Sequence, residues 1–317
     1  MKNYIKILMV SFGLFSLMSC DKEENPMYPQ GLSDNELINL YFPGDPTLYE
    51  DSITFSDNTN SDRNVLIEDF TGHLCNNCPP AAVIAKGIED ANPGRAFVLS
   101  VHAGGANNTF QTVTGKFDVD YTTDAGTSAS VDISGFVGNP SGMVSRSIPA
   151  SASSPWTFKD DWNNQVNDLI TTNDLKANIQ LQAEFYPETK GVFVHYEIEA
   201  LQDLGTNTRV IIFLAEKKTI SPQKMEDNST NETYEHHNVL SGNLTNGDFG
   251  DIINSNGMLT GEKTSGLVIN SLNELNDRRV INEDGGNDLI IFGLIVDGDT
   301  YEVLQVVEAA VEIDTQL

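Results

Sequence analysis

The chain has 317 residues, 39% of them hydrophobic, and a formal net charge of −28 from 18 basic and 46 acidic side chains. This length suits two domains of ordinary size, each with an apolar core. A surface this acidic repels a phosphate backbone, which excludes nucleic acid as a partner. No nicotinamide or flavin motif is present, so no cofactor is expected.

Residues 1–20 have the features of a lipoprotein signal peptide. Lys2 and Lys6 precede an apolar stretch, residues 7–18, that is too short for an ordinary spanning helix. The stretch ends in Leu-Met-Ser-Cys, which resembles a lipobox, so we expect Cys20 to carry lipid and to anchor the protein to the outer membrane. The alternative is a plain secretory signal with an incidental cysteine.

Residues 21–50 are predicted to be an acidic and polar tether. Asp21, Glu23 and Glu24 follow the lipobox cysteine directly, which resembles the surface-export signal of Bacteroidetes lipoproteins. Exposure at the cell surface is therefore one expected location, and an ordinary solvated tether is the alternative. An edge strand is expected at residues 52–55.

Residues 65–80 contain the motif around which the first domain, residues 51–173, is organised. An apolar six-residue strand at 65–70 is followed by Cys75, Cys78 and two prolines, which suit the first turn of a helix over 81–91. A cysteine at a helix N-terminus is favoured as a thiolate, which is the nucleophilic form. This order of strand, Cys-x-x-Cys and helix is typical of thioredoxin-like redox sites.

The rest of the first domain completes an α/β unit. A second buried strand at 96–102 forms a β-α-β unit with the first, so we expect parallel strands. Residues 104–130 are predicted to be a polar insertion with a helical piece. Pro140 precedes an apolar strand, and the apolar period of residues 156–170 predicts a closing helix.

The cysteine count favours a redox role. If Cys20 is lipidated, only Cys75 and Cys78 remain, and they enclose two residues. A structural disulfide gains most from closing a long loop, so this pair is poorly placed as a staple. An inert disulfide remains an alternative, and a closed zinc site would want four ligands, so no metal is expected.

The segment from Asp69 to Cys78 resembles the thioredoxin pattern Asp-Phe-x-x-x-x-Cys-x-x-Cys. The resemblance implies that Asp69 is a buried proton carrier, Cys75 the nucleophile, Cys78 the resolving thiol and Pro140 a cis-proline facing the cysteines. The chain departs from the pattern at Leu74, where tryptophan is usual, and in the asparagines between the cysteines. The redox potential is therefore left open.

The chain as a whole resembles the thioredoxin-like Omp28-related outer-membrane lipoprotein family of Bacteroidetes. The stretches that carry this resemblance are residues 65–82, 100–105, 137–146 and 234–242. The last of them lies outside any thioredoxin domain. The family implies an N-terminal thioredoxin-like domain and a C-terminal β-rich domain.

Residues 174–317 have the pattern of an antiparallel β-sandwich domain. Apolar and polar residues alternate over 177–185, and further strands are expected at 191–200, 209–216, 289–296 and 301–313. The last two flank Asp297-Gly298-Asp299, a hairpin signal. Residues 221–231 are predicted to be a polar loop.

Four histidines are weighed as site residues. His73 lies two residues before Cys75, and His102 ends its strand at the edge where open α/β sheets place their sites, so either could stabilise a thiolate. His236 and His237 are adjacent and point to opposite faces of a strand, which argues against one shared metal ion.

Two functions from different classes follow. The leading hypothesis is a lipid-anchored extracytoplasmic thiol-disulfide oxidoreductase or isomerase whose partners are protein thiols or disulfides. The alternative is a surface binding protein, a receptor component or an adhesin, that binds a surface ligand and uses the thioredoxin-like domain as a scaffold.

Overall fold

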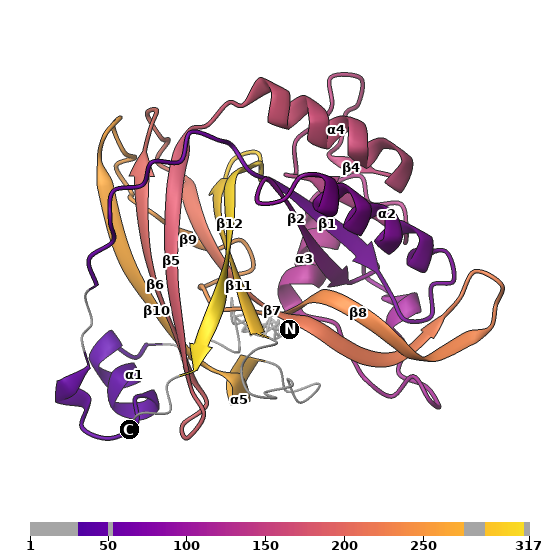
Figure 1. The fold of residues 1–317 in the computed structure, drawn as a ribbon, viewed down its shortest axis with the longest axis horizontal. Helices are drawn as coiled ribbons and strands as arrows, with labels where there is room; N and C mark the ends of the chain where they lie inside the picture. Colours follow the sequence, from indigo (N-terminus) through magenta and orange to yellow (C-terminus); the bar gives the residue numbers. More distant parts are fainter. Residues whose placement is uncertain (1–30, 50–52, 276–288, 314–317) are drawn as a thin grey trace, which may run out of the picture.

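The computed structural model describes residues 31–49, 53–275 and 289–313 (Figure 1). The expected signal peptide and the lipidation site at Cys20 lie outside these residues. A twelve-stranded mixed sheet runs through the molecule in the order β10-β6-β5-β12-β11-β7-β8-β2-β1-β3-β4, with β9 paired to β7. None of the helices in the described ranges has the length and apolar character needed to cross a bilayer.

The first half builds the thioredoxin-like arrangement that the sequence predicts. The central strand pairs in parallel with the strand that follows the cysteine helix, and antiparallel with the strand after Pro140. The elements are β1 (Val65–Thr71), α2 (Cys78–Ala91), β2 (Ala96–His102), η2 (Thr109–Gln111), α3 (Asp124–Asp132), β3 (Ser141–Val144), β4 (Trp156–Thr157) and α4 (Lys159–Thr172).

Two boundaries differ from the expectation. The helix after the cysteines begins at Cys78, so Pro79 and Pro80 occupy its first turn, where their missing N–H groups have no intrahelical acceptor to lose. Trp156 lies in β4 and not in the closing helix, which starts at Lys159. The apolar pattern of the sequence does not reveal the boundary between β4 and α4, because Trp156 in β4 and Trp162 in α4 are both buried.

Helices cover both faces of this sheet. On one face, side chains of α2 and α4 pack with Ile67, Val98 and Val144 in one apolar cluster. On the other face, Ala125 and Ala129 of α3 pack with alternate residues of β1 and β2. Burial on both faces explains why β1 reads as a nearly continuous apolar run.

The second half is mainly antiparallel, as expected, and its strands are longer than the sequence indicates. Its elements are β5 (Ala177–Tyr186), β6 (Gly191–Ala200), β7 (Thr208–Lys224), β8 (Thr230–Asn243), β9 (Asp251–Ile252), β10 (Lys263–Ser271), α5 (Leu272–Leu275), β11 (Leu289–Asp297) and β12 (Val303–Ile313). The expected hairpin between β11 and β12 is present.

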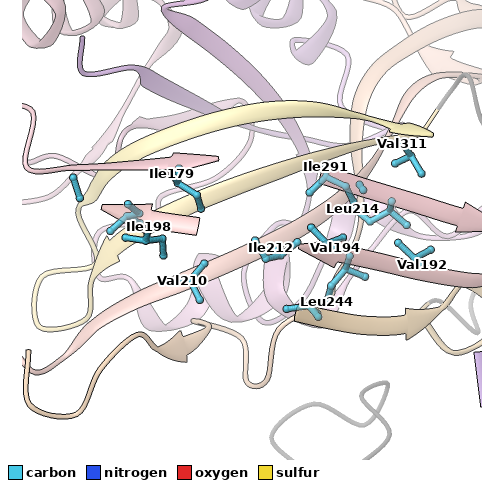
Figure 2. Close-up of a cluster of buried hydrophobic side chains, with 14 of the residues drawn as sticks. Ile179, Val192, Val194, Ile198, Val210, Ile212, Leu214, Leu244, Ile291 and Val311 are labelled. Carbon is cyan, nitrogen blue, oxygen red and sulfur yellow. The ribbon is translucent and has the colours of Figure 1, made fainter. Parts of the chain in front are cut away.

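Strands β7 and β11 are buried on both faces and join the two halves. Ile212 and Leu214 of β7 enter a cluster with residues of β5, β6 and β10, drawn in Figure 2. Ile211 and Phe213, on the opposite face of the same strand, enter the cluster that contains α3 and β1. Because successive side chains of a strand alternate in direction, one strand contributes to both cores.

Strand β8 connects the second half to the thioredoxin-like sheet. It pairs antiparallel with β7 and in parallel with β2 at Ser100 and Val239. The sheet is therefore continuous across the expected boundary at residues 173 and 174, and the structure does not confirm an independent sandwich. The prediction of a polar loop at 221–231 was wrong, because its residues form the paired ends of β7 and β8 and the turn between them.

The segment expected to be a tether contains a helix. Helix α1 (Asp34–Tyr41) packs against β6 and β10, and the short η1 (Pro46–Leu48) follows it in the chain. Leu37 is fully buried there with Phe193 and Ile269. The described part of the expected edge strand, residues 53–55, has no regular secondary structure.

Candidate active site

Cys75 and Cys78 form a disulfide at the start of α2, with their Cα atoms 5.4 Å apart. The turn that carries them is closed by backbone hydrogen bonds from Cys75 N to Gly72 O (3.0 Å) and from Cys78 N to Cys75 O (3.3 Å). Only 2% of Cys75 and 1% of Cys78 is exposed, so both residues lie beneath the surface. The two cysteines that the sequence predicts as a redox pair are therefore joined and covered.

Asp69 lies on β1 and lines the same cavity as Cys78. Its side chain is buried, and neither carboxylate oxygen has a hydrogen-bond partner among the residues that the structure describes. Burial disfavours the charged form and raises the pKa of Asp69 to about 7. This carboxyl group is therefore able to gain or lose a proton near neutral pH.

A cavity of about 50 Å³ separates Asp69 from the second half of the chain. Asp69, Cys78 and His102 line it from the first half, and Gln223, Tyr234 and His236 line it from β7 and β8. Burial raises the pKa of Tyr234, and the charge of Asp69 adds to that increase. A space of this size with several polar groups on its wall is suited to hold water.

Pro140 occupies the position that the resemblance implies, and the Asn139–Pro140 bond is cis. The side-chain amide of Asn139 donates to Thr71 O (3.0 Å) and to Ala103 O (2.7 Å). These carbonyls lie at and just beyond the carboxyl ends of β1 and β2. Asn139 therefore fixes the proline loop to the edge of the sheet that carries the cysteines.

An open groove of about 430 Å³ lies between the proline loop and the start of α2. Asn77, Pro80 and Pro140 line its floor side, and Phe158 and Val137, both more than half exposed, add apolar surface. Its volume lies within the range of about 300–1,000 Å³ that is typical of ligand-binding clefts. Neither cysteine is among its lining residues.

The two histidines expected beside the cysteines occupy different places. His102 lines the cavity that Cys78 also lines, and its Nδ1 lies 3.2 Å from Gln111 Oε1. His73 packs against Phe117 in the insertion, with Nε2 3.1 Å from Thr112 O. Burial lowers the pKa of His73. The structure thus brings His102, and not His73, to the cavity beneath the disulfide.

His236 and His237 point to opposite faces of β8, as expected. His236 is buried, within 3.0 Å of Ser221 Oγ, and His237 is exposed. No group of three or more His, Cys, Asp or Glu side chains in the described ranges is arranged to hold a metal ion.

Sequence analysis missed the contribution of Gln223 and Tyr234 to this site. Gln223 lies within the polar stretch 221–231, and Tyr234 follows it closely. A stretch with so few apolar residues is also typical of a solvated loop. The register between β7 and β8, and not the residue types, brings Gln223 and Tyr234 to the cavity that Cys78 also lines. A signal was present in the recurrence of Tyr234, His236 and Asn238 at period two, which places them on one strand face.

Comparisons with known proteins show the fold and no family. No family model matches the chain, and no curated protein matches it. Among solved structures, HBP35 of Porphyromonas gingivalis aligns with 81% of this chain and 79% of its own, with a TM-score of 0.60 and 15% identity. The chain therefore shares the overall fold of that protein.

Two further solved structures align more weakly. A domain of the outer membrane lipoprotein Omp28 from Porphyromonas gingivalis aligns with 44% of this chain and 91% of its own, at 18% identity and a TM-score of 0.28. A protein from Agrobacterium tumefaciens aligns with 82% of this chain and 99% of its own, at 12% identity and a TM-score of 0.46.

Proposed function

We propose that the protein is an extracytoplasmic thiol-disulfide oxidoreductase or isomerase that acts through Cys75 and Cys78. The observation that carries this proposal is Asp69, a buried carboxyl group without a hydrogen-bond partner in the described structure, beside a cavity that Cys78 also lines. An inert disulfide has no need of such a group.

Burial of the Asp69 side chain costs folding free energy. Burying a polar group without a hydrogen bond destabilises a fold by roughly 1–3 kcal/mol, and more when the group is charged. A leucine would fill this position at lower cost. Groups with strongly shifted pKa values beside a cleft are typical of functional sites, and a pKa of about 7 suits proton transfer at neutral pH.

In the oxidising direction, a substrate thiolate attacks Cys75 Sγ, and the electron pair of the Cys75–Cys78 bond moves to Cys78. Asp69 then gives its proton to the Cys78 thiolate. A second substrate thiolate attacks the substrate sulfur of the mixed disulfide and releases Cys75 as a thiolate at the N-terminus of α2. The substrate is oxidised to a disulfide, and the protein is reduced by two electrons.

We also propose a protein family, a membrane location and a class of partner. The thioredoxin-like arrangement, the fold shared with HBP35 and the matching stretches support assignment to the Omp28-related family. The lipobox supports a lipid anchor at Cys20 in the outer membrane, on its periplasmic or its cell-surface side. The partners are protein thiols or disulfides, reached through the groove beside Pro140.

One observation favours a second function. The near-complete burial of Cys75 and Cys78 is also what an inert disulfide requires. In that case the protein is a surface binding protein whose first half is a scaffold, and the groove beside Pro140 receives a ligand without any exchange of disulfides.

The reduction potential of the cysteine pair distinguishes the two functions. The chain from Asp21 onward is equilibrated with glutathione buffers, and its thiols are trapped by alkylation. We expect a potential between about −120 and −200 mV, the range of oxidants and isomerases. A pair below about −300 mV, or one that never exchanges, is structural and supports the binding function.

Two single variants test the roles of the cysteines. Cys78→Ser is expected to hold a substrate protein as a mixed disulfide, because Cys75 attacks and no second thiol releases it. Cys75→Ser is expected to hold none, although it also retains one cysteine. Equal trapping by both variants contradicts the assigned roles.

A further inference from the structure

The hairpin formed by β7 and β8 extends beyond the sheet toward the cysteines. Figure 1 shows its paired ends reaching past the arrowhead of β1 toward the start of α2. We call residues 221–234 the hairpin tip. It contains the end of β7, the turn at 225–229 and the start of β8.

The hairpin tip holds the cysteine turn by side-chain hydrogen bonds from Gln223. Its amide Nε2 lies within hydrogen-bond distance of three carbonyl oxygens, those of Cys75 (3.0 Å) and Gly72 (3.2 Å) in the turn and that of Lys224 (3.0 Å) in the tip. Gln223 is only 2% exposed, so these bonds are shielded from water. One side chain from the second half of the chain thus spans the turn that carries the disulfide.

Two more contacts extend this hold. The backbone N–H of Lys224 donates to His73 O (2.8 Å), and the side chain of Asn76 donates to Asn228 Oδ1 (3.3 Å). The cysteine turn is therefore bonded to the hairpin tip at Gly72, His73, Cys75 and Asn76 in succession. On its other side, Leu74 N donates to Phe110 O (3.1 Å) in the insertion.

These contacts hold the hairpin tip against the turn that carries the buried disulfide. Sulfur exchange requires an attacking thiolate to reach one sulfur along the line of the S–S bond. With Cys75 only 2% exposed, an incoming thiolate has no direct approach to it. The groove beside Pro140 ends at Asn77 and Pro80 and does not include either cysteine.

We propose that the hairpin tip is a movable cover over the Cys75–Cys78 disulfide and that Gln223 is the positioning residue that holds it closed. The inference rests on the proposed function, whose activity it would regulate. Exchange at Cys75 then requires the tip to separate from the turn, so the second half of the chain controls the redox site of the first.

The chemistry of the contacts favours a cover that opens. They are hydrogen bonds between polar groups, and water can replace each of them at a modest net cost. The turn of the tip is exposed at residues 226–229, and the pairing of β7 with β8 shifts register between Ser221 and Gln223. Opening therefore need not expose the apolar clusters that hold the two halves together.

Reduction by dithiothreitol measures the opening without requiring a protein substrate. One thiolate of the reagent attacks Cys75 Sγ and Cys78 leaves as a thiolate. The second reagent thiol then closes the oxidised ring and frees Cys75. The reagent loses two electrons and the protein gains them. The fraction of reduced protein is followed by labelling its thiols with a maleimide and measuring the increase in mass by mass spectrometry.

The decisive comparison is between Gln223→Ala and Gln202→Ala. Gln202 also donates two side-chain bonds, to Asp174 Oδ1 (3.0 Å) and Leu175 O (3.2 Å), but it is exposed and lines neither the cavity at Asp69 nor the groove beside Pro140. We expect Gln223→Ala to be reduced about tenfold faster than the wild type, because it loses two shielded hydrogen bonds between the tip and the turn. Gln202→Ala is expected to be reduced at the wild-type rate.

Asn228→Gly provides a variant that preserves the fold of the tip. Asn228 has φ of 64°, which glycine adopts without strain, so the substitution removes the amide and keeps the turn. We expect a smaller acceleration, about two- to threefold, because its bond to Asn76 is exposed. This variant carries the test if Gln223→Ala does not fold.

The inference is overturned if Gln223→Ala and Asn228→Gly are both reduced at the wild-type rate. It is also overturned if the wild type is reduced as fast as a short peptide with the same Cys-Asn-Asn-Cys disulfide. If the variants are reduced faster but the protein exchanges disulfides with no protein substrate, the hypothesis of a cover is supported and the oxidoreductase function is rejected. The two failures are therefore distinguishable.

Discussion

The two faces of β1 carry neighbouring carboxyl groups with opposite surroundings. Glu68 and Asp69 are each 1% exposed. Arg146 donates to both oxygens of Glu68, at 2.8 and 2.7 Å, in a buried ion pair. Asp69 has no such partner among the described residues and faces a cavity. A paired carboxylate holds the fold together, whereas an unpaired one costs stability and is available for chemistry.

The largest effect should come from breaking the pair. Arg146→Met leaves Glu68 buried and unpaired, which is expected to destabilise the protein by about 3–5 kcal/mol. The measurement is urea unfolding followed by circular dichroism. Combining Arg146→Met with Glu68→Leu should recover most of that loss, because no uncompensated charge is then left inside. A single variant as stable as the wild type would contradict the expectation that Glu68 is left as an uncompensated buried charge.

Removing the unpaired carboxyl group of Asp69 should stabilise the protein at neutral and alkaline pH. The folded protein keeps the Asp69 proton up to about pH 7, while the unfolded chain loses it near 3.8, so the stability of the wild type falls between these values. Asp69→Asn lacks this fall. Relative to pH 4, its stability advantage over the wild type should grow by about 2–4 kcal/mol at pH 8.

Unfolding by urea at several pH values checks this prediction. An advantage of Asp69→Asn that is the same at pH 4 and pH 8 would contradict a raised pKa at Asp69.

A smaller effect compares the two carboxyl groups directly. The charge of Asp69 helps to raise the pKa of Tyr234, so Asp69→Asn should lower that pKa. Glu68→Gln should not, because Glu68 points to the other face of β1. The titration of Tyr234 can be followed by NMR of its labelled ring. A shift of the same size in both variants would mean that Tyr234 responds to overall charge and not to the cavity.

Local patterns of the sequence predicted much of the first half. The strand at β1, its parallel pairing with β2 and the position of the cysteines follow from apolar runs and turn residues. Alternation along β1 predicts that Glu68 and Asp69 point to opposite faces, and the thioredoxin resemblance selects Asp69 as the one near the cysteines. Its lack of a partner does not follow from either, because Arg146 could be assigned to either acidic side chain until the register with β3 was known.

Long-range contacts limited prediction of the second half. The end of β7 reads as a loop because residues 221–231 are polar, yet the polar side chain of Gln223 is buried and bonded to the first half. Burial of polar groups is stable when they are hydrogen bonded, and those bonds join residues that are 148 to 151 positions apart. No local period reports such a partner. The continuity of the sheet through β8 escaped prediction for the same reason.

The pairing of β8 with β2 has a consequence for the order of events as the chain is made. Cys75 is synthesised 148 residues before Gln223, and the neighbouring strand β8 ends only at Asn243. Until those residues emerge, the sheet of the first half lacks one of its edges and the cysteines lack their cover. The sulfurs are therefore accessible to other thiols and oxidants until β7 and β8 have folded against the first half. Completion of the fold then brings the hairpin tip to the cysteine turn.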